Sequence, residues 1–403
     1  MGRRRGSSGE DSWIDWEWVN SLQQSDTDSG LTTTGRSSGI QILPAIKIKV
    51  QRLFHFVRQP TWIAAPVGEE YREYTSEDIM RFSSDPQYHL KMRQEIESRM
   101  NATFETFRQG SKMQDRSRQY IQSSMLEKLD KHELSNHLIP NYPFGCRRPT
   151  PGTGYLESLL DDKVHTIVGQ IERISEEGVV ADGGTTYPVD VLICATGFDT
   201  TFKPRFPILG SRGKCLNDAW NDEIQAYLGV AVPHYPNYFM VLGPNCPVGN
   251  GPVLIAIEHQ VSYIIQMLSK FQKENIRSFS VSSDATESFN RWKDEFMKQT
   301  VWQQDCRSWY KAGSKSGRVV ALWPGSTLHY LETIKTPRYE EWKWEYQIGA
   351  NRWAFLGNGQ STAEKRPGGN LGWYIRSQDD SPIDPCLKAA YSPLEKAVSA
   401  SLE

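Results

Sequence analysis

The segment from Tyr187 to Asp199 constrains the fold of this chain more than any other. It contains a short apolar run rich in β-branched residues, which consists of Val189, Val191, Leu192, Ile193 and Cys194. The run stops at Ala195, Thr196 and Gly197, whose side chains are small. Such a run is typical of a buried parallel strand, and a glycine at its carboxyl end lets backbone approach a ligand closely. We therefore expect an α/β protein with a ligand site after this strand, although an ordinary core strand followed by a turn fits the same residues.

The segments on either side predict how this strand is connected. Residues 167–182 alternate apolar and polar side chains around a Glu-Gly turn, which predicts a hairpin leading into the strand. Downstream, the Gly-Pro-Asn turn that ends at Asn245 and the glycine-rich turn 249–252 precede a helix-like stretch from Val253 to Phe271. Because such a turn leaves backbone amides and the positive end of the helix dipole free, an electron-rich ring or a phosphate can bind there. Asn245 and Val253 are thus candidate cofactor-binding residues.

Residues 35–57 predict a turn, a helix and a second buried strand. The turn contains Gly35 and Gly39, and the strand is the apolar run from Leu53 to Val57. Residues 1–34 are rich in Gly, Ser, Asp and Thr, and no apolar run precedes Gly35. We therefore expect no strand before this turn and a disordered or non-native segment over residues 1–34.

A helical insertion is predicted over residues 78–138. Its apolar side chains recur at steps of three or four, namely Met92, Ile96, Met100, Phe104 and Phe107. The insertion serves either as a lid over a pocket or as packing, and the pattern does not choose between them. Further along, aromatic residues alternate between Tyr339 and Gly359, which predicts a β-hairpin before the C-terminal tail.

Composition bounds the partners and the compartment. The chain has 403 residues, with 46 basic against 48 acidic side chains, which argues against a nucleic acid or a polybasic membrane contact. No stretch approaches a membrane span. The six cysteines are scattered without a close pair, so neither a zinc site nor a disulfide framework is indicated and a cytoplasmic location is expected. Composition leaves the oligomeric state unknown.

Together these motifs resemble the flavin-dependent monooxygenases. The resemblance rests on the strand end 195–199, the turn 243–245, the Glu258-His259-Gln260 helix, the loop 140–149 with its two arginines, and the Ser308-Trp309-Tyr310 stretch. The arginine pair before Pro149 is similar to the Baeyer–Villiger branch of the family. The resemblance implies an FAD/NAD(P)-binding Rossmann-like fold of two dinucleotide-binding domains. It also implies FAD, NADPH, dioxygen and a ketone, which is converted to an ester or lactone, with a polyketide or terpenoid of fungal secondary metabolism as the expected substrate.

The resemblance also assigns roles to particular residues. Arg148 would lie over the flavin and stabilise its negatively charged oxygenated form, and Trp309 would cover the nicotinamide. Arg147 and Arg58 would bind the NADP 2′-phosphate, and an arginine after the second strand favours NADP over NAD. The remaining cofactor-binding candidates lie at the two predicted turns, namely Gly35, Ser37, Ser38, Gly39, Gln41, Ala195, Thr196 and Gly197.

Two motifs that the family needs are absent from the sequence. These are the Gly-x-Gly-x-x-Gly turn for the FAD pyrophosphate and the Phe-x-Gly-x-x-x-His-x-x-x-Trp signature, and the turn near Gly39 departs from the glycine pattern. We therefore expect an N-terminally truncated fold: an NADP-binding domain over 35–165, the C-terminal part of an FAD-binding domain over 166–335, and the hairpin and tail over 336–403. A catalytically inactive homologue and an N- or S-oxygenating monooxygenase are the alternatives.

Overall fold

The computed structural model describes residues 30–34, 37–64 and 73–375. The segment 1–29, Gly35 and the tail from residue 376 lie outside the described residues, so the expectations made for them are not addressed. The chain divides into two compact units, of which the first runs to Phe271 and resumes from Ile276 to Glu345. The second unit consists of Gln272–Asn275 and the segment from Tyr346 onward. The expected boundaries near residues 165 and 335 stay predictions.

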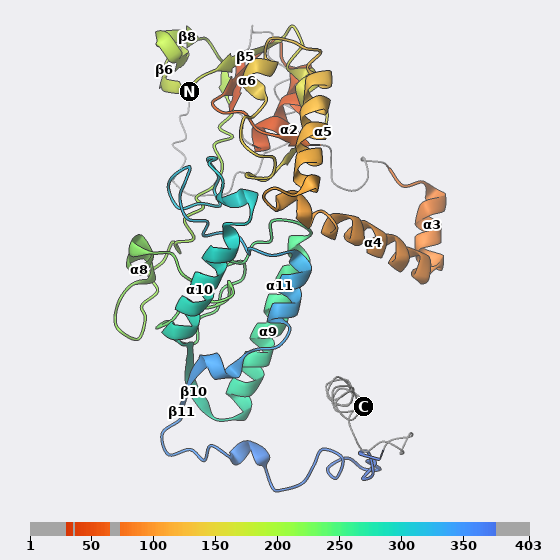
Figure 1. Cartoon of the computed structure of the whole chain (residues 1–403), viewed down its shortest axis with the longest axis vertical. Helices are drawn as coiled ribbons and strands as arrows, with labels where there is room; N and C mark the ends of the chain where they lie inside the picture. Colours follow the sequence, from red (N-terminus) through yellow and green to blue (C-terminus); the bar gives the residue numbers. More distant parts are fainter. Residues whose placement is uncertain (1–29, 35–36, 65–72, 376–403) are drawn as a thin grey trace, which may run out of the picture. The chain divides into compact units, whose positions relative to one another are not determined.

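A four-stranded parallel sheet organises the first unit, with strand order β5-β2-β1-β9. Its strands are β1 (Gly30–Thr34), β2 (Arg52–Val57), β5 (Val164–Val168) and β9 (Val191–Leu192). Helix α2 (Ser37–Ile46) connects β1 to β2, as the turn-helix-strand pattern predicts. Figure 1 labels strand β5 and helix α2 of this unit. The predicted α/β arrangement is therefore confirmed, with a strand–helix–strand crossover of the kind that parallel strands require.

The expectation of no strand before Gly35 is wrong. Residues Gly30–Thr34 form β1, which pairs in register with the whole of β2 from Gly30↔Arg52 to Thr34↔Phe56. On its other side β1 pairs with β9 through Leu31↔Val191 and Thr32↔Leu192. A strand between two parallel neighbours satisfies its backbone hydrogen bonds on both edges, and three threonines are β-branched residues that suit a strand. The strand therefore forms without an apolar run.

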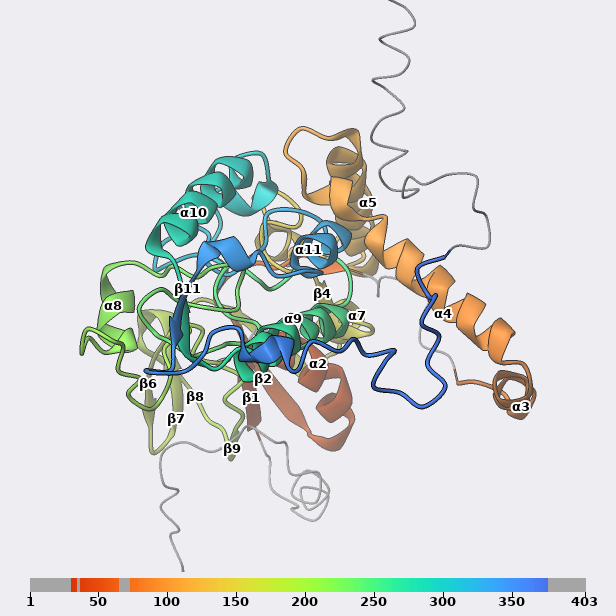
Figure 2. The same cartoon turned by 90° about the horizontal axis from the view of Figure 1, so that it is seen from below.

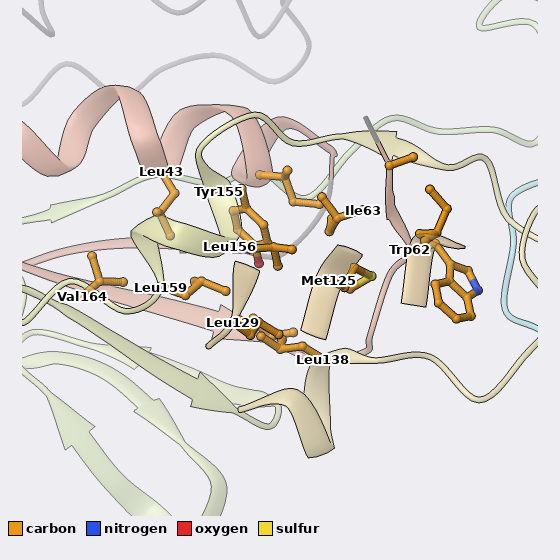
Figure 3. Close-up of a cluster of buried hydrophobic side chains, with 14 of the residues drawn as sticks. Leu43, Trp62, Ile63, Met125, Leu129, Leu138, Tyr155, Leu156, Leu159 and Val164 are labelled. Atoms are coloured by element: carbon orange, nitrogen blue, oxygen red, sulfur yellow. The ribbon is translucent and has the colours of Figure 1, made fainter. Parts of the chain in front are cut away.

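Both faces of β2 are covered, which explains its unbroken run of buried residues from Leu53 to Val57. On one face, Leu53 and Val57 join a helix-side cluster with α2, α5 (Lys112–Lys128) and α7 (Tyr155–Ser158). Figure 3 shows this cluster, with Leu43, Met125 and Tyr155 turned toward a common centre. On the other face, Phe54 and Phe56 pack against Val179 and Ala181.

The second cover layer is the predicted hairpin, extended by one strand. β6 (Ile171–Ser175), β7 (Gly178–Ala181) and β8 (Thr185–Tyr187) form a separate three-stranded sheet, and its strands lie side by side in Figure 2. Both β6 and β8 run antiparallel to β7. The hairpin prediction is confirmed, and the chain passes from β8 through Pro188 into β9.

The strand predicted from Val189 to Cys194 is parallel, as expected, but shorter and less buried. Only Val191 and Leu192 pair, and both are half-buried. β9 lies at the end of the strand order, so its outer edge has no neighbour among the described strands. An edge position explains the partial exposure, because only one side of the strand is covered by the sheet.

The segment in which the helical insertion is predicted is helical. It comprises α3 (Ser76–Ser84), α4 (Pro86–Asn101), the 3₁₀ turn η3 (Phe104–Phe107), α5 and α6 (Ser135–Leu138). A capping box begins α3, since Thr75 accepts from the backbone of Asp78 and the Asp78 carboxylate accepts from the backbone of Thr75. Helices α3 and α4 contain no buried residue, whereas α5 buries Ile121 and Met125. Helix α5 therefore serves in packing. For α3 and α4, both predicted roles stay open, namely a lid over a pocket and packing.

The later half of the chain contains the predicted helix α9 (Val253–Lys273), together with α8 (Leu216–Asp222), α10 (Ser283–Met297) and α11 (Thr327–Ile334). Short elements complete the described chain, namely η2 (Lys47–Lys49), β3 (Ile63–Ala64), β4 (Thr150–Pro151), η4 (Asp182–Gly184), η5 (Val301–Gln303), η6 (Tyr339–Glu341) and η7 (Ala354–Leu356). Within the described ranges, no helix is both long enough and apolar enough to cross a membrane.

The predicted hairpin at Tyr339–Gly359 is wrong. Only Trp342–Tyr346 forms a strand, β11, and its partner is β10 (Ile276–Val281) from much earlier in the chain. The aromatic side chains of β11 do have partners in β10: the Phe279 ring lies 5.7 Å from that of Trp342 and 5.4 Å from that of Trp344. The alternation of aromatic residues correctly predicted a strand at Trp342–Tyr346. The aromatic contacts with Phe279 favour its pairing with β10.

Candidate functional site

The parallel sheet creates a candidate dinucleotide site at the carboxyl ends of β1 and β9. The chain leaves β1 toward β2 on one side, while β9 arrives on the other side, so the strand order reverses between these two neighbours. In open α/β sheets, ligands bind in the crevice at such a reversal point. Helix α2 begins after β1, and the Ala195–Gly197 turn follows β9. Two predicted motifs thus meet at one edge.

The first turn of α2 presents polar groups at this edge. Ser37 and Ser38 are exposed, Gly39 is buried, and Gln41 is exposed. The Ser37 hydroxyl lies 3.3 Å from that of Thr150 in β4. The backbone amides of a first helical turn have no partner within the helix, and together with the helix dipole they favour a phosphate.

The turn after β9 has the small residues that a closely bound ligand requires. Ala195 is buried, whereas Thr196 and Gly197 are exposed. Gly197 has φ = +88°, a backbone conformation that a residue with a side chain adopts only with strain. The glycine is therefore needed for the path of the chain, whether or not a cofactor binds beside it.

Arg147 is anchored beside the segment that follows Arg58, its predicted partner at the 2′-phosphate. Arg58 directly follows β2, and the carbonyl of Pro60 accepts a hydrogen bond from Arg147 at 3.4 Å. The same carbonyl accepts from the Tyr142 hydroxyl at 2.8 Å. Burial raises the pKa of Tyr142, while the positive charge of Arg147 opposes this rise. Arg147 and Tyr142 thus share one acceptor, two residues after Arg58.

Tyr310 is the neighbour of Trp309 in the Ser-Trp-Tyr stretch. The Tyr310 side chain is fully buried, while Arg148 is exposed. Burial raises the pKa of Tyr310 to about 12, and the positive charge of Arg148 opposes this rise. The Tyr310 ring packs edge-on against Trp309 at 4.9 Å between ring centres, and Trp309 is 42% exposed. Trp309 therefore packs on a buried ring, and both candidate catalytic residues, Arg148 and Trp309, are exposed.

A disulfide joins the loops that carry these residues, although the scattered cysteines indicated no disulfide framework. Cys146 and Cys306 are linked at a sequence separation of 160, with their Cα atoms 6.4 Å apart. Pairing over such a distance cannot be deduced from sequence spacing. The disulfide also weakens the argument for a reducing cytoplasm, because disulfides persist mainly in oxidising compartments.

Asn245 differs from the exposed cofactor-binding candidates, because it lies in the interior. Its side chain is fully buried and donates to the Ala226 carbonyl at 3.2 Å and to Asn290 at 3.0 Å. Its backbone amide donates to Val320 at 2.8 Å. Asn245 therefore connects interior segments through its side chain, and only its remaining backbone is available to a ligand. Val253 is half-buried at the first position of α9.

Sequence reasoning missed Tyr310, Tyr142 and the Cys146–Cys306 pair as parts of this site. The Ser-Trp-Tyr stretch did point to Tyr310, but only its neighbour Trp309 was assigned a role. Tyr142 lies in the loop with the two arginines, so its proximity in sequence was a usable signal. The described residues contain no cluster of three or more His, Cys, Asp or Glu side chains that could hold a metal ion.

The described residues fit an NADP-type dinucleotide better than FAD. For NADP there is a reversal point, a helix N-terminus and two arginines near Pro60. For FAD, the described part offers the N-terminus of α9 and the turn at Gly197. The described strands include no second parallel sheet of more than two strands, and therefore no second strand-turn-helix unit for a pyrophosphate.

Comparison with known proteins gives close fungal relatives. The FAD-binding monooxygenase moxY of Dothistroma septosporum is 38% identical over 333 residues, which are 82% of this chain and 53% of the relative. The FAD-binding monooxygenase stcW of Emericella nidulans is 36% identical over 82% of this chain and 55% of its own length. The chain belongs to the flavin-dependent monooxygenase family. It spans about half the length of these relatives. No protein-family model matches the chain.

Solved structures show the same fold. Cyclohexanone monooxygenase from Rhodococcus sp. Phi1 bound to NADP⁺ superposes with a TM-score of 0.65 at 24% identity, covering 80% of this chain and 68% of the other. Oxidized steroid monooxygenase bound to NADP gives a TM-score of 0.65 at 20% identity, covering 80% and 67%. The fold is thus that of FAD/NAD(P)-binding flavoproteins with two dinucleotide-binding domains.

Proposed function

We propose that this protein takes part in an FAD- and NADPH-dependent oxygenation of the Baeyer–Villiger type. One oxygen atom of dioxygen enters next to a ketone carbonyl, giving an ester or lactone. NADPH and a proton supply the reducing equivalents, and the second oxygen atom leaves as water. A polyketide or terpenoid ketone of fungal secondary metabolism is the proposed substrate, because the relatives moxY and stcW are fungal.

The placement of two adjacent arginines carries this proposal. Arg147 donates to the Pro60 carbonyl, on the side of the predicted nucleotide phosphate. Arg148 lies on the loop that the Cys146–Cys306 disulfide ties to the segment of Trp309. We assign the two guanidiniums to two neighbouring anion sites. Such an arrangement would let one loop serve a coenzyme phosphate and a reacting centre together.

Each candidate residue has a separate role in the proposed reaction. Arg58, Arg147 and the first turn of α2 bind and orient the coenzyme. Arg148 places a permanent positive charge at the reacting centre, where bound flavin reduced by NADPH would activate dioxygen and deliver one oxygen atom. Trp309, half-exposed beside Tyr310, limits the access of water from its side.

An isotope experiment with an Arg148 variant tests this function. Because the chain is expected to bind flavin weakly, the protein is incubated with a large excess of FAD, together with NADPH, ¹⁸O₂ and a panel of ketones. We expect an ester carrying one ¹⁸O atom. Arg148→Ala should lower the rate of ester formation by about two to three orders of magnitude, because a preorganised charge opposite a developing anion is lost. Arg148→Lys should restore little, since a point charge does not replace a planar fork.

Arg291→Ala is the matched control, because Arg291 is an exposed arginine on α10. Its rate should equal that of the parent protein. Ester formation by Arg148→Ala at the parent rate would refute the role of Arg148. Oxygenation of sulfides or amines without any ester from ketones would place the protein in the N- or S-oxygenating class.

A further inference from the structure

Trp309 directly precedes a short hairpin, residues 310–320, which we call the Trp309 hairpin. Within it, Lys311 and Val319 form an antiparallel bridge. The last residue of the hairpin donates from its backbone to the carbonyl of the first, Tyr310, at 2.8 Å. The Trp309 ring packs on the ring of this first residue, with the ring centres 4.9 Å apart. The position of Trp309 therefore depends on where the hairpin is held.

Arg318 ties this hairpin to helix α10. Its Nε donates to the Asp294 carboxylate at 2.8 Å, and its Nη2 donates to the Asn290 side-chain oxygen at 2.9 Å. Its Nη1 donates to the Ile224 carbonyl at 2.8 Å and lies 3.3 Å from the Glu223 carboxylate, just after α8. All three guanidinium nitrogens thus have an acceptor, and the acceptors come from two separate segments. A planar guanidinium with so many partners holds one orientation.

The surroundings of Arg318 suit an anchor and not an anion site. Its side chain is 23% exposed, and the carboxylates of Asp294 and Glu223 both lie within 3.3 Å of it. These two carboxylates compensate the charge of the guanidinium. Several contacts in a fixed geometry also hold a side chain better than an isolated pair at the surface does.

A second side chain of α10 holds the hairpin by its backbone. Lys293 Nζ donates to the Val319 carbonyl at 2.8 Å, and both residues are fully buried. Lys293 directly precedes Asp294, the partner of Arg318, so the two contacts are neighbours on the helix. The hairpin is therefore fixed to α10 both through a side chain and through its main chain.

The same contacts reach Asn245, the cofactor-binding candidate at the end of the Gly-Pro-Asn turn. Its backbone amide donates to the Val320 carbonyl at 2.8 Å. Its side chain donates at 3.0 Å to the Asn290 oxygen that also accepts from Arg318. Asn290 is 3% exposed, and its own amide donates to two backbone carbonyls, so this oxygen has a fixed position. The turn and the hairpin thus share α10 as their support.

We propose that Arg318 is a positioning residue, which anchors the Trp309 hairpin on α10 and so fixes Trp309 relative to the Gly-Pro-Asn turn. The hairpin is then a fixed support for Trp309. The proposal deepens the proposed function, because it rests on the assignment of Trp309 to the reacting centre. The anchoring itself, however, can be measured without any oxygenation.

The first test measures backbone hydrogen exchange by mass spectrometry of overlapping peptides, in the parent protein and in Arg318→Ala. In the parent, the amides of Ala312 and Val320, which donate within the hairpin, should be protected. In the variant they should exchange at least about tenfold faster. The amides of β2 should exchange as before, because Arg318 contacts α10 and the end of α8. Arg318→Lys, which keeps the charge without the planar fork, should give intermediate rates.

Arg338→Ala is the matched control, because Arg338 is also paired with two carboxylates, those of Glu340 and Glu341. It should leave the exchange of the hairpin unchanged. Unprotected hairpin amides in the parent would overturn the proposal without any variant. Equal hairpin rates in the parent and Arg318→Ala would overturn it as well. Equal acceleration of the hairpin and β2 would show that Arg318 stabilises the whole protein instead of anchoring the hairpin.

The second test measures how much ester forms for each NADPH oxidised, with FAD in large excess. When water reaches the reacting centre, NADPH, a proton and dioxygen give NADP⁺ and hydrogen peroxide instead of ester. Arg318→Ala should therefore lower the ester formed per NADPH several-fold and raise peroxide to match. A loss of folded protein would lower both rates together and leave this ratio unchanged, so the ratio separates positioning from stability.

A double variant links this effect to Trp309. Trp309→Ala should itself lower the ratio of ester to NADPH, and Arg318→Ala should have no further effect in that background. A further loss there, or an unchanged ratio in Arg318→Ala alone, would contradict positioning through Trp309. If the parent protein forms no ester at all, the proposed function fails, while the exchange rates still decide whether Arg318 anchors the hairpin.

Discussion

At the scale of single residues, the site combines groups that the sequence points out with partners that it hides. The adjacent arginines 147 and 148 stand between prolines, and their charge and rigid setting single them out. Their surroundings are fixed by tertiary contacts: the Cys146–Cys306 disulfide ties the arginine loop to the loop of Trp309 across 160 positions. Local pattern carries no information about such contacts, so the arginines were predictable and the disulfide was not.

Arg58 gives the prediction that belongs to this scale. If it contacts the coenzyme 2′-phosphate, Arg58→Ala should weaken NADP⁺ binding roughly ten- to hundredfold, as expected for a charge-assisted hydrogen bond of about 1.5–3 kcal/mol. NAD⁺, which lacks this phosphate, should bind as before. Titration calorimetry with both coenzymes measures the two changes.

Arg52→Ala provides the control, since Arg52 is an exposed arginine at the opposite end of the same strand. It should change neither dissociation constant. A loss of affinity in Arg58→Ala that is equal for both coenzymes would remove Arg58 from the phosphate site.

At the scale of elements, apolar patterns predict strands whose faces are covered and miss those formed by backbone pairing alone. β2 was predictable because both of its faces pack against apolar clusters. β1 was not, because its pairing on both edges stabilises residues of no marked apolar character. For β11, alternation predicted a strand correctly but gave the wrong partner, since periodicity says nothing about which strand lies alongside.

A buried histidine in β2 makes the stability of this sheet depend on pH. His55 is fully buried, and its Nε2 lies 2.9 Å from the Tyr155 hydroxyl. Burial lowers the pKa of His55 from 6.5 to about 4. Between these values the unfolded chain binds a proton that the folded protein does not. This contribution to stability is therefore complete above pH 6.5 and is lost as the pH falls toward 4.

Replacement of His55 by Gln, which can hydrogen-bond but does not titrate in this range, should flatten that dependence. Over this interval we expect the free energy of unfolding of the parent to fall more than that of His55→Gln, by on the order of 3 kcal/mol. Urea denaturation at several pH values measures the difference. The exposed His137, changed to Gln, serves as control, and parallel curves for parent and His55→Gln would show that His55 does not carry the effect.

At the scale of the whole molecule, the chain combines one complete parallel sheet with a second half that has no such sheet in its described part. The overall fold class was predictable, because strand ends, turns and helix starts follow general rules for dinucleotide-binding proteins. The division into compact units was not, because the second unit joins Gln272–Asn275 to residues from Tyr346 onward, which are far apart in the sequence.

This arrangement predicts weak flavin binding by the 403-residue chain. The described residues have no second strand-turn-helix unit for the FAD pyrophosphate, and phosphate binding relies on such a helix N-terminus. Purified protein should be nearly colourless, with far less than one flavin for each chain by absorption spectroscopy. A stoichiometric yellow flavin spectrum would mean that another segment supplies the phosphate site.

The central claim is that the carboxyl edge of the parallel sheet binds NADP(H), with Arg58 and Arg147 at the 2′-phosphate. A crystal structure of the protein with NADP⁺ tests it most directly. The account predicts that the coenzyme lies at the reversal point between β1 and β9, with 2′-phosphate oxygens within hydrogen-bonding distance of both guanidiniums. A coenzyme bound elsewhere, or a 2′-phosphate that contacts neither arginine, would contradict it.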